Sequence, residues 1–244
     1  MDDRAERDLL ADILDWDIYN WGRAVGFWDE KAHAIARAKP GFSVLEIGAA
    51  GGGISLYWAL LGANVLCSEI DGQFDRARAL HAKHGVSDRV RYEALDAANV
   101  LDKPFPYKNE FDVVTFKSVI GGVGVGDDTL YNQVALFENI YYALKPGGYL
   151  FFCENLVGSK LHMKARELLT DHVGSWRYVT IDKVLALADR FDPIEYETFG
   201  AVGIFGRTDA LSAAFGAVDR QFDRLVKPEN RYIISAVCKK PEDA

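Results

Sequence analysis

The middle of the chain alternates short apolar runs with longer segments whose apolar residues recur every three or four positions. A short apolar run is typical of a buried strand, and the longer spacing is typical of a helix with one face in the core. The expected strands are 43–47, 64–68, 90–94, 112–116 and 149–153, and the expected helices between them are 54–61, 74–84 and 130–144. Apolar strands that alternate with helices predict a parallel sheet covered on both faces.

The N-terminal stretch 1–40 is predicted to form a helical cap. Within it, apolar residues line one face of a helix at 5–15, and a second helix is expected at 29–38. After the fifth strand, Thr180 is a predicted N-cap for a helix at 181–190, because its hydroxyl can accept a free backbone N–H of the first turn.

The last third of the chain predicts an antiparallel hairpin that carries a helical insert. Its segments are strands at 194–199 and 232–238 and a helix at 208–225. The predicted fold class is therefore α/β, a doubly wound and mostly parallel seven-stranded sheet with an antiparallel C-terminal hairpin. We expect a domain over 41–244 with substrate-covering insertions at about 155–179 and 200–229, because such long connections are often functional.

Composition limits the partners that the protein can have. The formal net charge of −8 disfavours binding to phosphate backbones, so we expect no nucleic-acid partner. No apolar run approaches the roughly 18 residues that span a bilayer, so we expect no membrane partner. Three cysteines lie singly in apolar runs, at Cys67, Cys153 and Cys238. These features predict a cytoplasmic protein, either a monomer or a homodimer.

The strongest chemical signal is a glycine-rich turn after the first strand, in V-L-E-I-G-A-A-G-G-G-I-S-L at 44–56. Glycines let the backbone turn sharply and let a ligand approach the start of the next helix. Glu46 lies two residues before the turn, where a carboxylate would repel a pyrophosphate but suit a cationic ligand. Glu69 ends the second strand, where it can accept ribose hydroxyls. Asp96 follows the third strand, where we expect it to be positioned for an adenine amino group.

These motifs together resemble the class I S-adenosylmethionine-dependent methyltransferases. The family's acid-x-Gly-x-Gly-x-Gly motif falls on Glu46, Gly48, Ala50 and Gly52, with alanine at the middle glycine. The family's ribose-binding acid falls on Glu69 and its adenine-side acid on Asp96, and its F-D-x-V and L-K-P-G-G motifs fall on 111–114 and 144–148. The resemblance covers roughly residues 40–155 and the final hairpin.

The resemblance implies a Rossmann-like methyltransferase fold and S-adenosylmethionine as cofactor. The implied cofactor-binding residues are Glu46, Gly48, Ala50, Gly52, Glu69, Ile70, Asp96, Ala97 and Lys117. Two other classes remain open on the residues alone. Gly48-x-Ala50-x-x-Gly53 also approaches the fingerprint of a nicotinamide-dependent oxidoreductase. A binding module that keeps the cofactor fold without chemistry would have the same motifs.

Candidate catalytic residues are expected at the ends of the fourth and fifth strands, because ligands in open α/β sheets bind outside the carboxyl ends of the strands. His162 and Glu154 are the candidate general bases, and burial could raise the pKa of Glu154. Lys117 is expected to orient the substrate or to meet the cofactor carboxylate. Since Phe116 and Lys117 stand where a catechol-type site would need an acid, we expect no metal ion.

The acceptor is expected to be a small or medium polar molecule. O-methylation of a sugar or a specialised metabolite is the first hypothesis, and N-methylation of an amino sugar or small amine is the second. Aromatic residues at 16–28 and at Trp176 could roof the pocket, since aromatic faces pack on sugar C–H faces and on other rings. Core packing is the alternative for the N-terminal aromatics.

Overall fold

The computed structural model describes residues 3–14, 18–98, 105–123, 129–169, 176–203 and 209–244. Its centre is one seven-stranded sheet with the strand order β3-β2-β1-β4-β5-β7-β6. The strands are β1 (Ser43–Ile47), β2 (Asn64–Glu69), β3 (Val90–Ala94), β4 (Phe111–Lys117), β5 (Leu144–Asn155), β6 (Ile194–Phe199) and β7 (Ile233–Lys239). β1 to β5 pair in parallel, and β7 runs antiparallel to both β5 and β6. The predicted fold class is confirmed.

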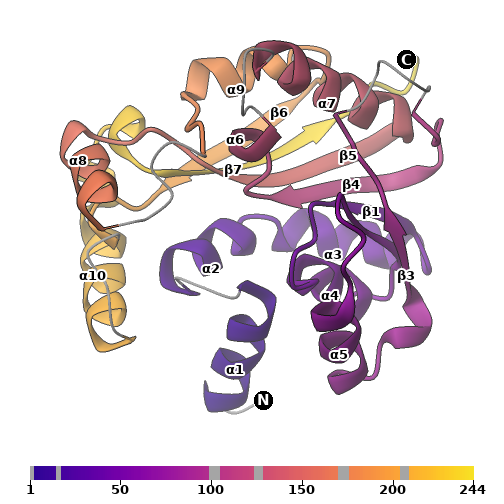
Figure 1. The fold of residues 1–244 in the computed structure, drawn as a ribbon, viewed down its shortest axis with the longest axis horizontal. Helices are drawn as coiled ribbons and strands as arrows, with labels where there is room; N and C mark the ends of the chain where they lie inside the picture. The colour runs from indigo at the N-terminus through magenta and orange to yellow at the C-terminus, as the bar shows by residue number, and fades with distance from the viewer. Residues whose placement is uncertain (1–2, 15–17, 99–104, 124–128, 170–175, 204–208) are drawn as a thin grey trace.

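Helices cover both faces of the sheet. Figure 1 shows α6, α7 and α9 over one face and α3, α4 and α5 under the other. The helices are α1 (Asp3–Leu14), α2 (Ile18–Gly26), α3 (Asp29–Ala38), α4 (Gly53–Leu60), α5 (Asp75–Lys83), α6 (Ile120–Val123), α7 (Thr129–Ala143), α8 (Lys160–Leu169), α9 (Ile181–Leu187) and α10 (Asp209–Phe222). Across the described parts of the chain, no helix combines the length and apolar character that crossing a membrane requires.

Two hydrophobic clusters form the core, one on each face of the sheet. Successive residues of β5 point to opposite faces, so Phe151 enters one cluster and Phe152 the other. Phe151 lies 5.9 Å from the ring of Trp28 and 4.9 Å from the ring of Trp58. Trp28 is fully buried there, so this N-terminal aromatic belongs to the core and does not roof a pocket.

Two differences from the sequence-based elements concern α2 and β5, and the helices α6 and α8 were not predicted either. A helix at Ile18–Gly26 was not predicted, because its aromatic residues suggested a pocket wall and two glycines interrupt it. β5 begins at Leu144, five residues before the predicted start, because Leu144 already pairs with Phe111 across a bulge. The predicted cap at Thr180 is confirmed, since its hydroxyl accepts the Lys183 N–H at 3.3 Å.

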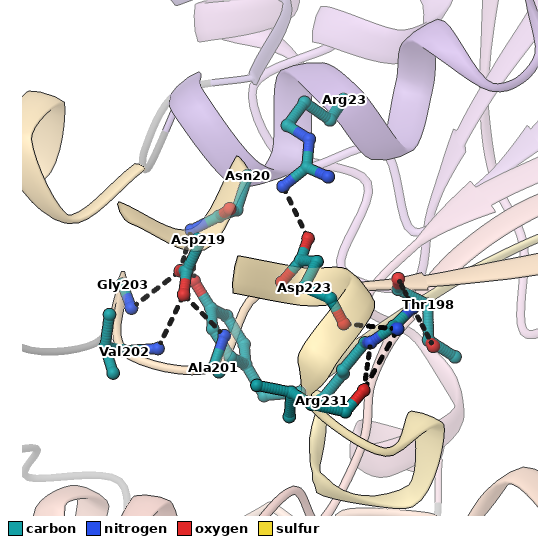
Figure 2. Close-up of polar contacts among 11 residues, drawn as sticks. Asn20, Arg23, Thr198, Ala201, Val202, Gly203, Asp219, Asp223 and Arg231 are labelled. Carbon is teal, nitrogen blue, oxygen red and sulfur yellow. Dashed lines mark hydrogen bonds and ion pairs between the residues drawn. The ribbon is translucent and has the colours of Figure 1, made fainter. Parts of the chain in front are cut away.

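A buried carboxylate connects α10 to α2 (Figure 2). Asp219 of α10 is 1% exposed, and its Oδ1 accepts the N–H groups of Ala201 and Val202, each at 2.9 Å. Its Oδ2 accepts the N–H of Gly203 at 3.0 Å and the side-chain amide of Asn20 at 2.9 Å. Four donors therefore compensate the burial of this carboxylate, and they fix the chain before α10 against α2.

Candidate functional site

A tight glycine turn joins the end of β1 to the start of α4. Gly48 and Gly52 have φ values of +65° and +80°, which glycine adopts without steric cost, and Ala50 lies at +47°. A side chain at Gly48 would place its Cβ 2.9 Å from the Val119 Cγ2 atom of the neighbouring strand end. The turn 48–52 therefore presents bare backbone at the carboxyl end of the sheet.

Two cavities open on either side of this turn, and both include Gly48 and Ala50 in their walls. The larger cavity has a volume of about 650 Å³, and the smaller one about 420 Å³. On its β2 and β3 side the larger cavity is lined by Glu69, Ile70, Asp96 and Ala97. On its β4 side the lining residues include Ser118, Val119, Gly122, Val123 and Trp176. Ligands of open α/β sheets bind in this position.

The two acids of the larger cavity are oriented by backbone N–H groups. Glu69 accepts the N–H of Ala50 on Oε2 at 2.8 Å and the N–H of Ile70 on Oε1 at 3.0 Å. Asp96 accepts the N–H of Ala98 on Oδ1 at 3.0 Å. An ionised carboxylate offers about four acceptor positions, so both acids retain capacity for ligand hydroxyl or amino groups.

The smaller cavity is lined by an acidic side chain, Glu46, and a basic side chain, Lys117. Glu46 is 2% exposed, and its Oε2 accepts both the N–H and the hydroxyl of Ser55. Burial raises the pKa of Glu46 to about 8. The Lys117 ammonium donates to the Leu14 carbonyl at 2.8 Å and lies 5.2 Å from the centre of the Trp21 ring. Glu46 and Lys117 thus both line the smaller cavity.

The structure corrects the expectation that Gly52 contacts a ligand. Gly52 is not among the described residues that line either cavity, and it faces α5. A Cβ at this position would lie 2.6 Å from the Ala77 Cβ and 3.0 Å from the His81 Cε1. Glycine is therefore required at position 52 for the close approach of turn and helix.

The C-terminal end of α1 forms part of the wall of the smaller cavity. Ile13 and Leu14 belong to its wall, and a Cβ on Gly53 would lie only 2.1 Å from the Ile13 carbonyl oxygen. Asp12 accepts hydrogen bonds from Lys83, the last residue of α5, at 2.5 Å and from His84, the residue that follows, at 2.7 Å. Helix α1 is thus fixed over the start of α4 by contacts from two elements.

Glu154 lies behind the wall of the larger cavity. The carboxyl group is 0% exposed, and its Oε2 accepts the N–H groups of Val119 and Ile120 at 2.8 and 2.7 Å. Its Oε1 accepts the N–H of Asn155 at 2.9 Å. Burial raises the pKa of Glu154 to about 7, as the sequence suggested. Since both oxygens point to backbone donors, the structure corrects the expectation that Glu154 is placed as a base.

His162 is also placed differently from the expectation. Its ring is 1% exposed, stacks 4.4 Å from the ring of Tyr232, and lines neither cavity among the described residues. Burial, with a contribution from Arg166, lowers the pKa of His162 to about 3. A buried ring of such low basicity is a poor proton acceptor at neutral pH, so the expected role as general base is corrected too.

The comparisons with known proteins agree with this site. The model of a family described as a methyltransferase domain matches residues 45–150, which include β1 to β4, the glycine turn and most of the cavity wall. The ubiquinone/menaquinone biosynthesis C-methyltransferase UbiE of a Shewanella strain is 24% identical over 72% of this chain and 70% of its own length. These matches identify the chain as an S-adenosylmethionine-dependent methyltransferase.

Solved structures show the same fold for this methyltransferase. A putative sarcosine dimethylglycine methyltransferase from Galdieria sulphuraria aligns with a TM-score of 0.63 at 12% identity, over 91% of this chain and 86% of that one. A phosphoethanolamine N-methyltransferase from Haemonchus contortus, solved with S-adenosylhomocysteine, aligns with a TM-score of 0.54 at 18% identity. That alignment covers 87% of this chain and about half, 52%, of the nematode protein.

The cofactor of this methyltransferase is S-adenosylmethionine, and the residues present fit it. Glu69 and Asp96, with acceptor capacity to spare, would hold the ribose hydroxyls and the adenine amino group at the larger cavity. Ile70 and Ala97 add apolar surface there. Glu46 and Lys117 would face the charged amino-acid end in the smaller cavity, where bare backbone at the turn permits close approach.

The sequence did not reveal that a residue of α5 contacts the glycine turn of the methyltransferase site. His81 lies on α5, and its Nε2 lies 2.9 Å from the Gly52 carbonyl oxygen. Only the spacing of His81 on the helix that follows β2 could have indicated this contact. For a metal ion, the described residues contain no group of three or more potential ligands, and Asp127 and Asp128 lie outside them.

Proposed function

We propose that the methyltransferase transfers the methyl group of S-adenosylmethionine to a small-molecule acceptor that binds on the β4 side of the larger cavity. One observation carries the proposal: Glu69 and Asp96 occupy one side of this cavity, which leaves a wall of Val119, Gly122 and Trp176 opposite them. This wall is largely apolar, although the same cavity is also lined by Ser118, Tyr131 and Asn132. It suits a molecule with a flat or apolar face.

S-adenosylmethionine supplies an electrophilic methyl group on a sulfonium centre. The task of the chain is to hold the acceptor in line with that centre and to exclude water. Alignment of two reactants can contribute roughly 7–11 kcal/mol to the barrier reduction. Trp176 supports the second task, because its indole packs against Gly121 and Gly122 at the wall of the cavity and excludes water there.

The residues that line the larger cavity limit the chemistry of the acceptor. The sequence favoured O-methylation of a sugar or specialised metabolite, with N-methylation of an amine as the alternative. Among the described residues of the larger cavity, no histidine or lysine stands ready to remove a proton. We therefore favour an acceptor that is nucleophilic without a strong base, such as a phenol or an aromatic amine among the specialised metabolites. A sugar hydroxyl fits less well.

The test measures S-adenosylhomocysteine formation with a panel of acceptors. The panel contains a phenol, an aromatic amine and a sugar, and mass spectrometry locates the new methyl group on oxygen, nitrogen or carbon. Carbon is included because UbiE is named as a C-methyltransferase. We expect turnover with the phenol or the amine. Turnover with the sugar alone would overturn the acceptor class, and binding of S-adenosylmethionine without any turnover would support the non-catalytic module.

A variant pair tests the cofactor site directly. Glu69→Ala should weaken binding of S-adenosylhomocysteine by roughly tenfold or more, because charge-assisted hydrogen bonds to ribose hydroxyls would be lost. Glu197→Ala is the control, since Glu197 is exposed on β6 at the far edge of the sheet. Equal affinity of both variants, or tight binding of a nicotinamide cofactor to the wild type, would contradict the assignment.

The remaining expectations are part of the same proposal. We propose a cytoplasmic monomer or homodimer that has no nucleic-acid partner and needs no metal ion. Removal of divalent ions with EDTA should leave turnover unchanged. Loss of turnover that magnesium restores would contradict metal independence.

A further inference from the structure

A buried histidine lies directly beneath the glycine turn and outside both cavities. His81 of α5 is 0% exposed. Its Nε2 lies 2.9 Å from the Gly52 carbonyl oxygen, and its Nδ1 lies 2.8 Å from the hydroxyl oxygen of Tyr92 on β3. The imidazole therefore connects a strand, a helix and the turn through two hydrogen bonds.

The two partners determine which ring nitrogen carries the hydrogen. A backbone carbonyl can only accept, so the His81 Nε2 must be the donor to Gly52. Burial, with a smaller contribution from His84, lowers the pKa of His81, which keeps the ring neutral. Nδ1 is then free of hydrogen and accepts the Tyr92 hydroxyl. Each nitrogen has one partner, so the orientation of the ring is fixed.

The Gly52 carbonyl connects the glycine turn to the start of α4. Gly52 has left-handed backbone angles, and its carbonyl also accepts the N–H of Leu56 at 2.9 Å, which opens α4. The turn then continues back to Ala50, whose N–H donates to Glu69. A shift of the Gly52 carbonyl would therefore move Ala50 relative to the carboxylate expected to hold the ribose.

We propose that His81 is a positioning residue for the cofactor. Its imidazole, oriented by the Tyr92 hydroxyl, holds the Gly52 carbonyl in place. The Ala50 N–H therefore stays in position to donate to the Glu69 carboxylate. His81 touches neither cavity and acts only through the turn. The inference rests on the cofactor site described above and does not depend on the identity of the acceptor.

Three variants test the proposal, with calorimetric binding of S-adenosylhomocysteine as the readout. His81→Leu removes both hydrogen bonds and should weaken binding by roughly tenfold. His81→Gln keeps an amide that can donate to Gly52, so it should bind within about threefold of the wild type. Tyr92→Phe removes only the orienting hydroxyl and should weaken binding by roughly threefold.

Two controls and one spectrum separate this role from general stability. His33→Leu and Tyr196→Phe change an exposed histidine of α3 and an exposed tyrosine of β6, and both should bind like the wild type. Nitrogen-15 spectra of the histidine rings should show one His81 tautomer with the hydrogen on Nε2. Binding is compared at a temperature at which thermal unfolding shows every variant to be folded.

Each contrary outcome has a distinct meaning. If the wild type binds no S-adenosylhomocysteine, the cofactor site itself is refuted. If the wild type binds and His81→Leu binds equally well, the positioning role is overturned. Binding by His81→Gln as weak as by His81→Leu would also overturn it, because shape and not the hydrogen bond would then matter. Should His81→Leu not fold, wild-type affinity in Tyr92→Phe would be the overturning result.

Discussion

The carboxyl group of Glu154 is held by backbone N–H groups behind the wall of the larger cavity. Its oxygens accept three backbone N–H groups, two of them from the start of α6. In Glu154→Gln an amide NH₂ group must face one or more of these donors, so the free energy of unfolding should fall by about 1–3 kcal/mol. Chemical denaturation measures this change, with the exposed Glu197→Gln as the control.

Turnover distinguishes the two roles of Glu154. Loss of a general base reduces the rate by about 10²–10⁴-fold. A support of the wall should instead give a smaller loss of turnover that accompanies the loss of stability. Turnover of Glu154→Gln reduced more than a hundredfold in a variant of wild-type stability would show that Glu154 is the base after all.

Glu46 makes the stability of the protein depend on pH. Burial raises its pKa from 4.5 to about 8, so between these values the folded chain binds one proton more than the unfolded chain. Stability from this group is therefore present at low pH and is lost as pH rises toward 8, by at most about 1.4 kcal/mol per pH unit. In the Glu46→Gln variant the side-chain amide at this position cannot titrate.

The difference in unfolding free energy between Glu46→Gln and the wild type isolates this effect, because all other titrating groups cancel. The unfolding free energy of the variant minus that of the wild type should increase as pH rises from about 5 to about 8. Above that range the difference should be constant. Denaturation curves at several pH values measure it. A difference that does not change with pH would mean that Glu46 is already ionised in the folded chain.

Of the predicted site residues, Glu69 and Asp96 line the larger cavity, whereas Glu154 and His162 do not. Glu69 and Asp96 stand at strand ends, and the carboxyl ends of parallel strands meet at one edge, so their placement follows from topology. Glu154 also ends a strand, but its direction depends on which backbone N–H groups the turn after β4 offers. His162 follows on a helix whose rotation is set by packing on Tyr232. Tertiary contacts of this kind leave no local pattern in the sequence.

At the scale of elements, apolar runs predicted the strands well because a strand buried on both faces has almost no polar positions. The observed β1, β3 and β6 have the predicted bounds, 43–47, 90–94 and 194–199. The aromatic helix α2 was missed because its apolar and aromatic pattern serves packing against α10 and the sheet. The division into a cap at 1–40 and a domain at 41–244 remains a prediction.

Helix α1 offers a prediction at the element scale. Gly53→Ala would place a methyl group 2.1 Å from the Ile13 carbonyl oxygen, so the last turn of α1 must move away from the glycine turn. We expect a loss of about 1–3 kcal/mol in unfolding free energy, typical of overpacking. Hydrogen exchange should show faster exchange in α1 than in the wild type.

The matched control for α1 is Gly26→Ala in α2. A Cβ there would meet only the Asp29 Oδ2 atom, at 3.8 Å, so exchange in α1 should not change. If Gly53→Ala left α1 protected as in the wild type, the contact between Ile13 and Gly53 would not be what fixes this helix.

At the scale of the whole molecule, the N-terminal helices and the helical insert near the C-terminus form one unit around buried polar groups. Asn20 and Asp219 are 199 positions apart in sequence and share a hydrogen bond of 2.9 Å. Nearby, the Arg23 guanidinium lies 2.6 Å from the Asp223 carboxylate (Figure 2). Both segments should therefore open together when the protein unfolds locally.

A double-mutant cycle tests this coupling. Asn20→Ala and Asp219→Ala should each destabilise the protein, and the double variant should be less destabilised than their sum by about 0.5–3 kcal/mol, because the hydrogen bond can be lost only once. Asn20→Ala combined with the exposed Glu197→Ala should be additive within about 0.5 kcal/mol. Additivity of the first pair as well would mean that α2 and α10 open independently.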